Sequence, residues 1–363
     1  MGNKVIYLTV TNDLTYDQRM MRICTTLANN GYNVTLVGRR LKSSSMLEKR
    51  SYQQKRFSCL INKGPLFYLE YNMRLFLYLL TRRSDILCAI DLDTILPVYF
   101  ASLLKKSKRV YDAHELFCEM KEVVERPFIY RIWKWIEKLT VPKFSYGYTV
   151  NQPIAEEFKK MYGVNYEVIR NVPFKSRQTA GSQRSDYILY QGAVNEGRSF
   201  ETLIPAMKMI DAKLVIAGDG NFMERLKQLI VGNDVAHKVE LAGMVSPDRL
   251  KLLTLSAKAG ITIFEKNSHS NYMSLANRFF DYIQAGLPQV CVDYPVYRSI
   301  NDTYDVAVLT EDISPEALAE KINMLLTDTE LWMRLHNNCK TAGAELNWEN
   351  EEKLLVDFYN KIY

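Results

Sequence analysis

His114 is the first residue in the sequence whose neighbours suggest chemistry. It lies in the stretch VYDAHELFCEM (residues 110–120), between Asp112 and Glu115, in a chain with only four histidines. A zinc-protease motif would read H-E-x-x-H, but Cys118 stands where its second histidine would be. The zinc-protease interpretation therefore fails. The plainest alternative is a histidine that bonds a neighbouring strand carbonyl.

A second polar cluster lies in NYMSLANRFFDYIQAGLPQVCVDYP (residues 271–295). Ser274 and Asn277 can cap a helix whose N-terminal amides form a ready anion site. Asp281, one turn further along, offers a carboxylate suited to the two adjacent hydroxyls of a ribose. A nucleoside diphosphate would satisfy both groups. The alternative is an ordinary capped helix that ends at the AGLP turn (residues 285–288).

Other common chemistries lack their motifs. Gly218 and Gly220 follow a strand-like run, but Met223 takes the place of the third glycine of a dinucleotide-binding G-x-G-x-x-G. The first strand-to-helix turn, TNDLTYD, has no glycine at all. The chain also has no G-x-x-x-x-G-K-[ST] loop and no G-x-S-x-G elbow. Nicotinamide enzymes, P-loop enzymes and α/β-hydrolases are therefore disfavoured.

Strands and helices must position these groups, and the first part of the chain has an alternating pattern. KVIYLTV (residues 4–10) is apolar and β-branched, the next segment has apolar residues at helical spacing up to Gly31, and NVTLVGR (residues 33–39) is again strand-like. Such a β-α-β unit requires a parallel sheet with a right-handed crossover. The pattern recurs along the chain, so we predict a doubly wound α/β domain over residues 1–174.

A second α/β series follows a polar stretch. FKSRQTAGSQRSD has no apolar period, and we predict a linker over residues 175–186. Strand and helix patterns then alternate over residues 187–346, which predicts a second Rossmann-like domain. Two such domains in tandem predict a cleft between them. Ligands of these sheets bind at the carboxyl ends of strands, and His114 follows one such strand.

Charge is unevenly distributed along the chain. Residues 1–172 hold 27 Lys and Arg against 16 Asp and Glu, although the net charge of the whole chain is only +6. A basic half can attract nucleic acid, an anionic membrane surface or a phosphorylated acceptor. The basic run at residues 39–56 precedes an aromatic-rich run at residues 66–80, a pairing that suits peripheral membrane contact. The alternative is a solvated basic loop followed by a buried helix.

The N-terminus and the cysteines bear on localisation. MGNKVIYLTVTND lacks the basic region, apolar core and cleavage site of a signal peptide. The six cysteines form no C-x-x-C pair or close cluster. The run at residues 66–80 is shorter than a bilayer span of roughly 20 apolar residues. We predict a protein of the reducing cytoplasm, with a peripheral position at the inner face of the cytoplasmic membrane.

Almost the whole chain resembles the retaining glycosyltransferases of family 4 (glycosyl transferases group 1), which have the GT-B fold. Residues 277–288, NRFFDYIQAGLP, are similar to the family's nucleotide-binding helix, N-K-L-F-E-Y-x-A-A-G-L-P. Further segments match in order: the opening D-x-R helix and G-x-x-V-T strand (residues 16–38), the D-x-H-E segment (residues 111–117), the V-x-G-x-G turn (residues 214–220) and the closing helix (residues 345–359). The resemblance implies two Rossmann-like domains, with residues 347–363 returning to the first.

The resemblance implies a donor site in the second domain. Arg198 matches a basic residue, usually lysine, that contacts the donor diphosphate, and an arginine can neutralise phosphate with a bidentate fork. Asp281 matches the acidic residue that holds the ribose. The other implied donor contacts are glycines close to the donor and residues at the helix start: Gly192, Gly218, Gly220, Ser274, Leu275, Ala276 and Asn277.

The resemblance places the acceptor site in the first domain. His114 matches the family's cleft histidine and is predicted, with Arg198, to be catalytic, by bonding a sugar hydroxyl or the developing phosphate charge. Asp17, Arg19 and Glu115 are predicted beside it. Arg19 would meet an acceptor phosphate or form a surface salt bridge. Glu115 and Asp112 would orient the histidine or cap local backbone, and neither is predicted to be a catalytic base. No metal ion and no cofactor are implied.

The predicted function is therefore the transfer of a sugar from a nucleoside-diphosphate sugar to a glycan or lipid-linked acceptor in bacterial surface-polysaccharide biosynthesis. An anionic membrane surface is a further predicted partner, and nucleic acid is not. Two positions depart from the family's fuller motif: Met273 replaces an acidic residue and Ala193 an arginine. These departures leave open a non-catalytic glycan- or nucleotide-binding partner of a transferase. A GT-B nucleotide-sugar epimerase is the other alternative, disfavoured by the few matched acidic residues.

Overall fold

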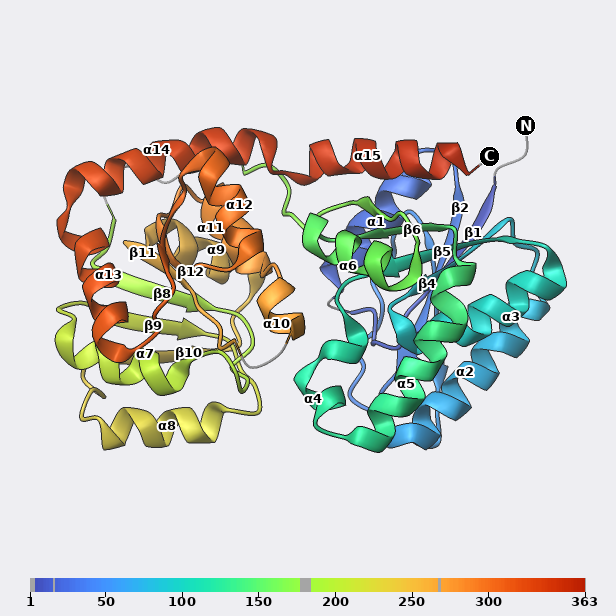
Figure 1. Cartoon of the computed structure of the whole chain (residues 1–363), viewed down its shortest axis with the longest axis horizontal. Helices are drawn as coiled ribbons and strands as arrows, with labels where there is room; N and C mark the ends of the chain where they lie inside the picture. Colours follow the sequence, from blue (N-terminus) through green and yellow to red (C-terminus); the bar gives the residue numbers. More distant parts are fainter. Residues whose placement is uncertain (1–3, 16, 177–183, 267–268, 363) are drawn as a thin grey trace. The chain divides into compact units, whose positions relative to one another are not determined.

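The chain folds into two compact units, which are described separately here (Figure 1). The computed structural model describes residues 4–15, 17–176, 184–266 and 269–362. Unit 1 comprises Met1–Asn171 and Glu351–Tyr363, and unit 2 comprises Val172–Asn350. Of the predicted linker, residues 177–183 lie outside the described residues.

Unit 1 is built on a parallel sheet of seven strands in the order β3-β2-β1-β4-β5-β6-β7. The strands are β1 (Val5–Thr9), β2 (Asn33–Arg40), β3 (Gln53–Ser58), β4 (Ile86–Ile90), β5 (Lys108–Ala113), β6 (Tyr146–Thr149) and β7 (Glu167–Val168). The chain leaves β1 in one direction and later returns to add β4 on its other side. This reversal makes the sheet doubly wound, as predicted, and creates a switch point between β1 and β4.

The helices of unit 1 connect these strands. They are α1 (Gln18–Asn29), α2 (Gly64–Leu80), α3 (Ile95–Lys105), α4 (Lys121–Val124), α5 (Pro127–Thr140) and α6 (Gln152–Tyr162). Their ends follow local chemistry. The side chain of Asn151 caps α6 by accepting from the amide of Ile154, and Gly163 ends it with a φ of 69°.

One segment of unit 1 differs from the sequence-based expectation. Residues 53–58 belong to the basic run, for which a solvated loop was the alternative to membrane contact, but they form the edge strand β3 beside β2. Exposed and partly buried residues alternate along it, which is the pattern of a half-covered edge strand. Lysine and arginine on such an edge also discourage pairing with other chains.

Unit 2 is built on a parallel sheet of six strands in the order β10-β9-β8-β11-β12-β13. The strands are β8 (Tyr187–Gln191), β9 (Lys213–Ala217), β10 (Val239–Gly243), β11 (Ala259–Thr262), β12 (Gln289–Val292) and β13 (Ala307–Thr310). Here too the direction of winding reverses, so the switch point lies between β8 and β11. Both units therefore confirm the predicted pair of doubly wound Rossmann-like sheets.

The helices of unit 2 cover the sheet and lead out of it. They are α7 (Phe200–Ala206), α8 (Met223–Gly232), α9 (Pro247–Ser256), α10 (His269–Met273), α11 (Asn277–Gln284), α12 (Pro295–Tyr304), α13 (Pro315–Thr327) and α14 (Thr329–Glu345). The core residues of these strands and helices, including Phe200, Phe279 and Trp332, are fully or almost fully buried. This burial supplies the main drive for folding the unit.

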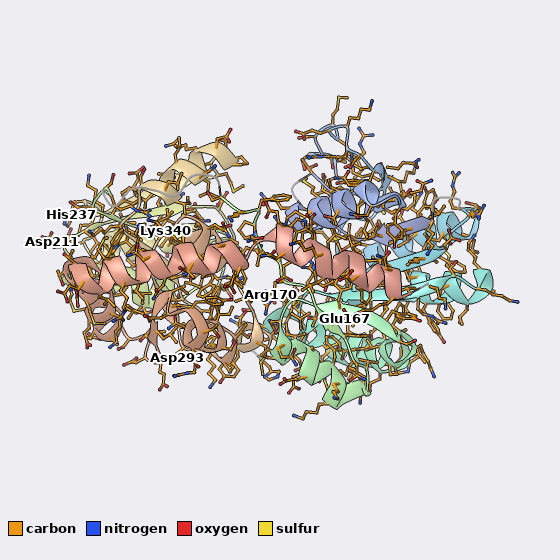
Figure 2. The ribbon with its side chains drawn as sticks, turned by 90° about the horizontal axis from the view of Figure 1, so that it is seen from above. Glu167, Arg170, Asp211, His237, Asp293 and Lys340 are labelled. Atoms are coloured by element: carbon orange, nitrogen blue, oxygen red, sulfur yellow. The ribbon has the colours of Figure 1, made fainter. Side chains whose placement is uncertain are left out.

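The last helix, α15 (Trp348–Lys361), packs against unit 1 from Glu351 onward. The carboxylate of Glu351 accepts from the backbone amide of Arg170 at 2.8 Å and forms an ion pair with its guanidinium at 3.0 Å. Lys361 pairs with Glu167 at 3.0 Å, and Figure 2 shows Arg170 and Glu167 beside this helix. The predicted return of the C-terminal helix to the first domain is confirmed.

Candidate functional site

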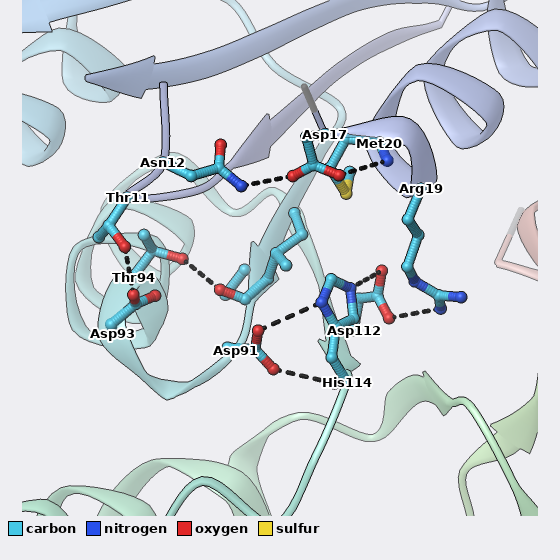
Figure 3. A network of polar contacts seen from close by, with 12 residues as sticks. Thr11, Asn12, Asp17, Arg19, Met20, Asp91, Asp93, Thr94, Asp112 and His114 are labelled. Atoms are coloured by element: carbon cyan, nitrogen blue, oxygen red, sulfur yellow. Dashed lines mark hydrogen bonds and ion pairs between the residues drawn. The ribbon is translucent and has the colours of Figure 1, made fainter. Parts of the chain in front are cut away.

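In unit 1, His114 lies at the carboxyl end of β5, held between two carboxylates (Figure 3). Its Nε2 lies 3.1 Å from Oδ2 of Asp112, and its Nδ1 lies 3.3 Å from Oδ2 of Asp91. Its backbone amide donates to Oδ1 of Asp91 at 2.9 Å. Asp91 follows β4 at the switch point and adopts a φ of 55°, a conformation that L residues rarely adopt. The imidazole is therefore fixed at both nitrogens.

Arg19 and Asp112 form a buried ion pair behind the histidine. The guanidinium donates to Oδ1 of Asp112 at 2.9 Å and to the carbonyl of Ile169 at 3.2 Å. The side chains of Arg19 and Asp112 are 4% and 0% exposed. This pair is thus neither a surface salt bridge nor an exposed phosphate contact. Its placement favours a role for Arg19 in orienting Asp112 and, through it, His114.

The electrostatics of this network favour a charged imidazole. Burial works against the charge, but Asp91 and Asp112 outweigh it and raise the pKa of His114 to about 9. Burial also opposes ionisation of Asp112, yet Arg19 and His114 lower the pKa of that carboxyl below its ordinary value. At neutral pH, His114 is therefore a cation rather than a free proton acceptor.

Asp91 and Asp93 are the residues that sequence reasoning missed in this network. Burial raises the pKa of Asp91 to about 6 and that of Asp93 to about 7. Thr11, after β1, donates its hydroxyl to Asp93. The signal available in the sequence was the D-x-D pattern directly after the apolar run of β4, at a strand end. A carboxyl with a pKa near neutrality suits proton transfer.

The other two predicted acceptor residues lie near this network. Asp17 caps α1 by accepting from the amide of Met20 at 2.9 Å, and it also accepts from the side chain of Asn12. Glu115 follows His114 and is partly buried, and its carbonyl accepts from the amide of Phe117 at 3.0 Å. The structure therefore gives Asp17 a clear local role in starting the helix that carries Arg19.

In unit 2, two glycine turns meet at the carboxyl ends of β8 and β9. Gly218 has a φ of 153°, and a Cβ there would lie 1.8 Å from the carbonyl oxygen of Gly192. A Cβ on Gly220 would lie 2.3 Å from the carbonyl oxygen of Val194. These turns require glycine because the two loops touch through their backbones. An open depression of about 480 Å³ lies beside them, with Asp219, Gly220 and Gly243 among its lining residues.

Two arginines lie against one aromatic ring at the switch point of this sheet. Arg198, in the loop after β8, has its guanidinium carbon 4.7 Å from the ring centre of Phe264, which follows β11. The guanidinium carbon of Arg278, on α11, lies 4.6 Å from the same ring centre and 4.4 Å from that of Tyr190. Cations over aromatic faces are attracted by the ring quadrupole. The arrangement concentrates positive charge beside Gly192.

Arg278 was not predicted, and its surroundings are unusual for a cation. It is 7% exposed, and its Nη atoms donate to the carbonyls of Gln191 at 3.3 Å and Ile263 at 3.5 Å. Its Nε has no hydrogen-bond partner, and no ion pair joins it to a carboxylate among the described residues. Buried charges are normally paired. The sequence held no local signal for this burial, because α11 also contains Asn277, Asp281 and Gln284.

Asp281 lies one turn after Arg278 and is linked to β8. Its Oδ2 accepts from the side-chain amide of Gln191 at 2.9 Å, and the other end of that amide accepts from the hydroxyl of Thr254 at 2.8 Å. Asp281 is only partly buried. The carboxylate is thus held at the same sheet edge as the two arginines, on a helix that the sequence predicted correctly.

The start of α11 corrects one prediction. The N-cap residue is Ala276 and no side chain caps the helix, so the predicted capping by Ser274 and Asn277 is wrong. The hydroxyl of Ser274 donates instead to the carbonyl of Asn271 at 2.9 Å. The amide of Ala276 donates to the hydroxyl of Tyr297, on α12, which fixes the start of the helix from outside. Leu275 packs partly buried against the core of unit 2.

Two family models match the chain, one after the other. The model described as Glycosyltransferase Family 4 matches residues 18–173, and the model described as Glycosyl transferases group 1 matches residues 172–342. A relative among curated proteins is an uncharacterized glycosyltransferase of Methanocaldococcus jannaschii, 29% identical over 50% of this chain and 47% of its own length. The chain spans about half the length of the curated relatives it matches.

Solved structures share the fold over nearly the whole chain. The sucrose-phosphate synthase of Thermosynechococcus elongatus has a TM-score of 0.83 at 14% identity and covers 99% of both chains. HepE of Anabaena, crystallised with UDP-glucose, has a TM-score of 0.77 at 11% identity, over 98% of this chain and 99% of its own. At these identities the likeness shows the fold, which is GT-B.

Proposed function

Since the chain belongs to the family 4 glycosyltransferases and has the GT-B fold, we propose that it transfers a sugar from a nucleoside-diphosphate sugar to a hydroxyl of a glycan or lipid-linked acceptor, with retention of the anomeric configuration. Bacterial surface-polysaccharide biosynthesis is the setting that we propose for this reaction. The predicted donor residues lie in unit 2, and the predicted acceptor residues lie in unit 1.

One observation carries the donor half of this proposal. Arg198 and Arg278 place two guanidinium groups on Phe264 at the switch point of the unit 2 sheet, and Asp281 lies one helical turn further along. Two cations suit a diphosphate, and a carboxylate suits the paired hydroxyls of a ribose. Gly192, at the end of β8, lets the backbone come close to the ligand. These groups therefore suit the two parts of a nucleoside diphosphate, the phosphates and the ribose.

The acceptor half rests on the network around His114. The charged imidazole stabilises a developing negative charge, and Asp91 holds its Nδ1 at 3.3 Å. Asp112 and Arg19 act as positioning residues because they are buried and hold the imidazole in place. The motif that led to His114 thus extends to residues on two other segments, the end of β4 and helix α1.

The leaving diphosphate would be stabilised by Arg198, Arg278 and the amides at the start of α11. We propose a front-face route, in which the departing phosphate assists deprotonation of the acceptor and no glycosyl-enzyme intermediate forms. Detection of a glycosylated side chain by mass spectrometry, after incubation with the sugar nucleotide in the absence of acceptor, would overturn this route.

The test of the proposed function is a donor panel with and without acceptor. The full chain is incubated with sugar nucleotides, beginning with UDP-glucose because the similar HepE structure contains it, and free nucleoside diphosphate is measured with and without membrane extract. We expect release that depends on the extract, and a labelled sugar in the extracted glycan or lipid fraction. An Asp281→Asn variant should require more donor for the same rate.

The other functions give different results in the same experiment. An epimerase would isomerise the donor without releasing nucleoside diphosphate. A non-catalytic partner would bind nucleotide with no turnover on any donor, and this result would make Met273 and Ala193 the relevant departures from the family pattern. Release that does not depend on the extract would indicate a donor hydrolase.

A further inference from the structure

Helix α5 of unit 1 carries an exposed apolar stripe. Phe128 and Trp135 are 71% and 63% exposed, and Ile132 and Leu139 extend the same stripe. The inward face is also apolar: Ile136 is buried there beside Glu137, and the ring of Trp133 packs against that of Phe117. A helix that only covers a core turns one apolar side inward. Core packing therefore accounts for only one of the two apolar sides of α5.

The neighbouring helix α2 carries a second exposed apolar stripe. Leu66, Leu69, Met73 and Leu77 recur at helical spacing and are each more than half exposed. The opposite side of α2 is buried in the core through Tyr71, Leu75 and Leu79. The helix is therefore apolar on both sides, and core packing accounts for only one of them. Large apolar surfaces that gather in one place mark a binding site.

These stripes belong to one face of unit 1. The ring of Tyr68 on α2 meets that of Trp133 on α5 at 5.2 Å, and Lys105 on α3 donates to the carbonyl of Leu80 at the end of α2. Right-handed crossovers from β3 to β4, β4 to β5 and β5 to β6 put all three helices on the same side of the sheet. Figure 1 shows α2, α3 and α5 next to one another in unit 1. We call the outward side of these helices the apolar face.

Helix α3 completes the apolar face. Phe100, Leu103 and Leu104 are exposed on it, the last of them at 68%. The face thus combines exposed leucine, methionine, phenylalanine and tryptophan side chains on three adjacent helices. Tryptophan and phenylalanine are the residues that favour the boundary between water and the lipid acyl chains.

Cations outnumber carboxylates on the segments that form the apolar face. Residues 63–83, 95–109 and 126–143, which contain the three helices, hold thirteen Lys and Arg against two Asp and Glu. Both carboxylates are engaged within the protein. Glu70 accepts from the backbone amides of residues 60 and 61 and pairs with Arg74, and Glu137 is buried and pairs with Lys134. Such an excess of cations at the edge of an apolar surface complements anionic phosphate groups.

We propose that the apolar face of α2, α3 and α5 is a binding surface for an anionic lipid bilayer, in which the helices lie in the plane of the headgroups. Within the described residues, no helix combines the length and apolar character needed to cross a membrane. The sequence suggested membrane contact only for residues 39–56 and 66–80, of which the second run lies in α2. The apolar face adds α3 and α5, and α5 carries the aromatic side chains Phe128 and Trp135. The bilayer is favoured over a protein partner because cations surround the apolar side chains, and anionic headgroups would meet them on every side.

This inference goes beyond the proposed sugar transfer and can fail or hold independently of it, because lipid binding is measured without donor or acceptor. The full chain is mixed with vesicles of equal parts phosphatidylglycerol and phosphatidylcholine, and binding is measured by flotation. We expect binding that decreases as salt is added and that is much weaker for vesicles of phosphatidylcholine alone.

The variants separate the apolar face from exposed apolar residues elsewhere. Phe128→Ser with Trp135→Ser should weaken partition to the anionic vesicles by about tenfold or more, because two large side chains no longer enter the acyl region. The matched control is Val231→Ser with Leu252→Ser in unit 2, where the two residues are 75% and 64% exposed. This control should bind as the wild type does. All four substitutions are at the surface, and circular dichroism verifies folding.

A second readout does not depend on affinity. Tryptophan fluorescence of the wild type should shift to shorter wavelength when anionic vesicles are added, and Trp135→Phe should remove most of that shift while the protein still floats. Equal binding of the Phe128→Ser, Trp135→Ser variant and the wild type would overturn the proposal. So would a wild-type dimer in sedimentation that this variant abolishes, since a second copy of the chain would then be the occupant.

Discussion

At the scale of single residues, His114 is defined by the groups that hold it. Two carboxylates bind its ring nitrogens, and one of them is fixed in turn by the buried guanidinium of Arg19. Removing the imidazole would leave Asp91 and Asp112 facing each other without their shared cation. A neutral glutamine in place of His114 removes the charge but fills a similar volume. The effect of this substitution on sugar transfer can then be compared with its effect on stability.

The variant His114→Gln should lower sugar transfer by about 100-fold or more, because a preorganised cation is lost. Its affinity for UDP, measured by calorimetry, should change less than about twofold, because binding of the nucleotide is assigned to unit 2. Exposed His237 in unit 2 provides the control, and His237→Gln should leave both quantities unchanged. Equal activity per folded molecule in His114→Gln would show that the histidine is only structural.

The same residue predicts how stability depends on pH. The pKa of His114 is about 9 in the folded chain against 6.5 ordinarily, so its stabilisation is complete below pH 6.5 and is lost as the pH rises through 9. The pKa values of Asp91 and Asp93 are raised to about 6 and 7, so protonation of these carboxyls changes the free energy of unfolding mainly below pH 7. Between pH 7 and 9 the free energy of unfolding should therefore fall, by on the order of 2 kcal/mol, in the wild type and much less in His114→Gln.

Arg278 gives the clearest residue-scale test of the donor site. Arg278→Met should weaken UDP binding by about tenfold or more, since an anion loses a preformed buried cation. Thermal stability should fall only modestly, because the substitution frees two backbone carbonyls and leaves no paired carboxylate behind. Arg184, partly buried in unit 2 and bonded to backbone carbonyls of residues 254, 255, 257, 285 and 286, is the matched control. Arg184→Met should lower stability more and leave UDP affinity unchanged.

At the scale of elements, the glycine turns decide whether the donor loops can form. Gly218→Ala would place a methyl group 1.8 Å from the carbonyl oxygen of Gly192, at a φ of 153° that disfavours any side chain. We expect the free energy of unfolding to fall by about 3 kcal/mol and UDP binding to be lost. Gly232, at the end of α8, has open space at its Cβ position. Gly232→Ala should be neutral or slightly stabilising, which denaturant titration of both variants can verify.

Most of the strands could be predicted from the sequence alone. The alternation of apolar runs and helical spacing was enough for every strand apart from β3, because buried parallel strands are mostly apolar and this pattern is local. The edge strand β3 was not predicted, since its alternation is weak and its pairing with β2 is a tertiary contact. The start of α11 was misjudged because the hydroxyl of Tyr297, twenty-one residues later, replaces the side-chain cap.

The site was predictable to a different degree. His114, Arg198 and Asp281 could be proposed from the sequence because each follows a strand or occupies a recognisable motif. Asp91 and Arg278 were missed because their importance comes from burial and from partners on other elements, which no local pattern contains. The residue type alone does not show whether a charged side chain is buried or exposed.

At the scale of the whole molecule, assigning the donor to unit 2 predicts where UDP acts. A ligand stabilises the part of a protein that it binds, by about 2.7 kcal/mol at a hundredfold excess over its dissociation constant. Hydrogen exchange of the full chain should therefore slow over residues 188–200, 215–222 and 275–285 when UDP is added. Arg278→Met at the same UDP concentration should show little of this protection.

The same experiment weighs the two halves of the proposed mechanism against each other. UDP lacks both the transferred sugar and the acceptor hydroxyl that the network of Asp91 and His114 is proposed to serve. UDP should therefore protect this network from exchange far less than it protects α11. Protection centred on residues 91–114 and absent from residues 275–285 would contradict the assignment of the diphosphate to Arg198 and Arg278. The basic charge of unit 1 would then have to be explained by nucleotide binding, and the apolar face would remain to be tested separately by its binding to anionic vesicles.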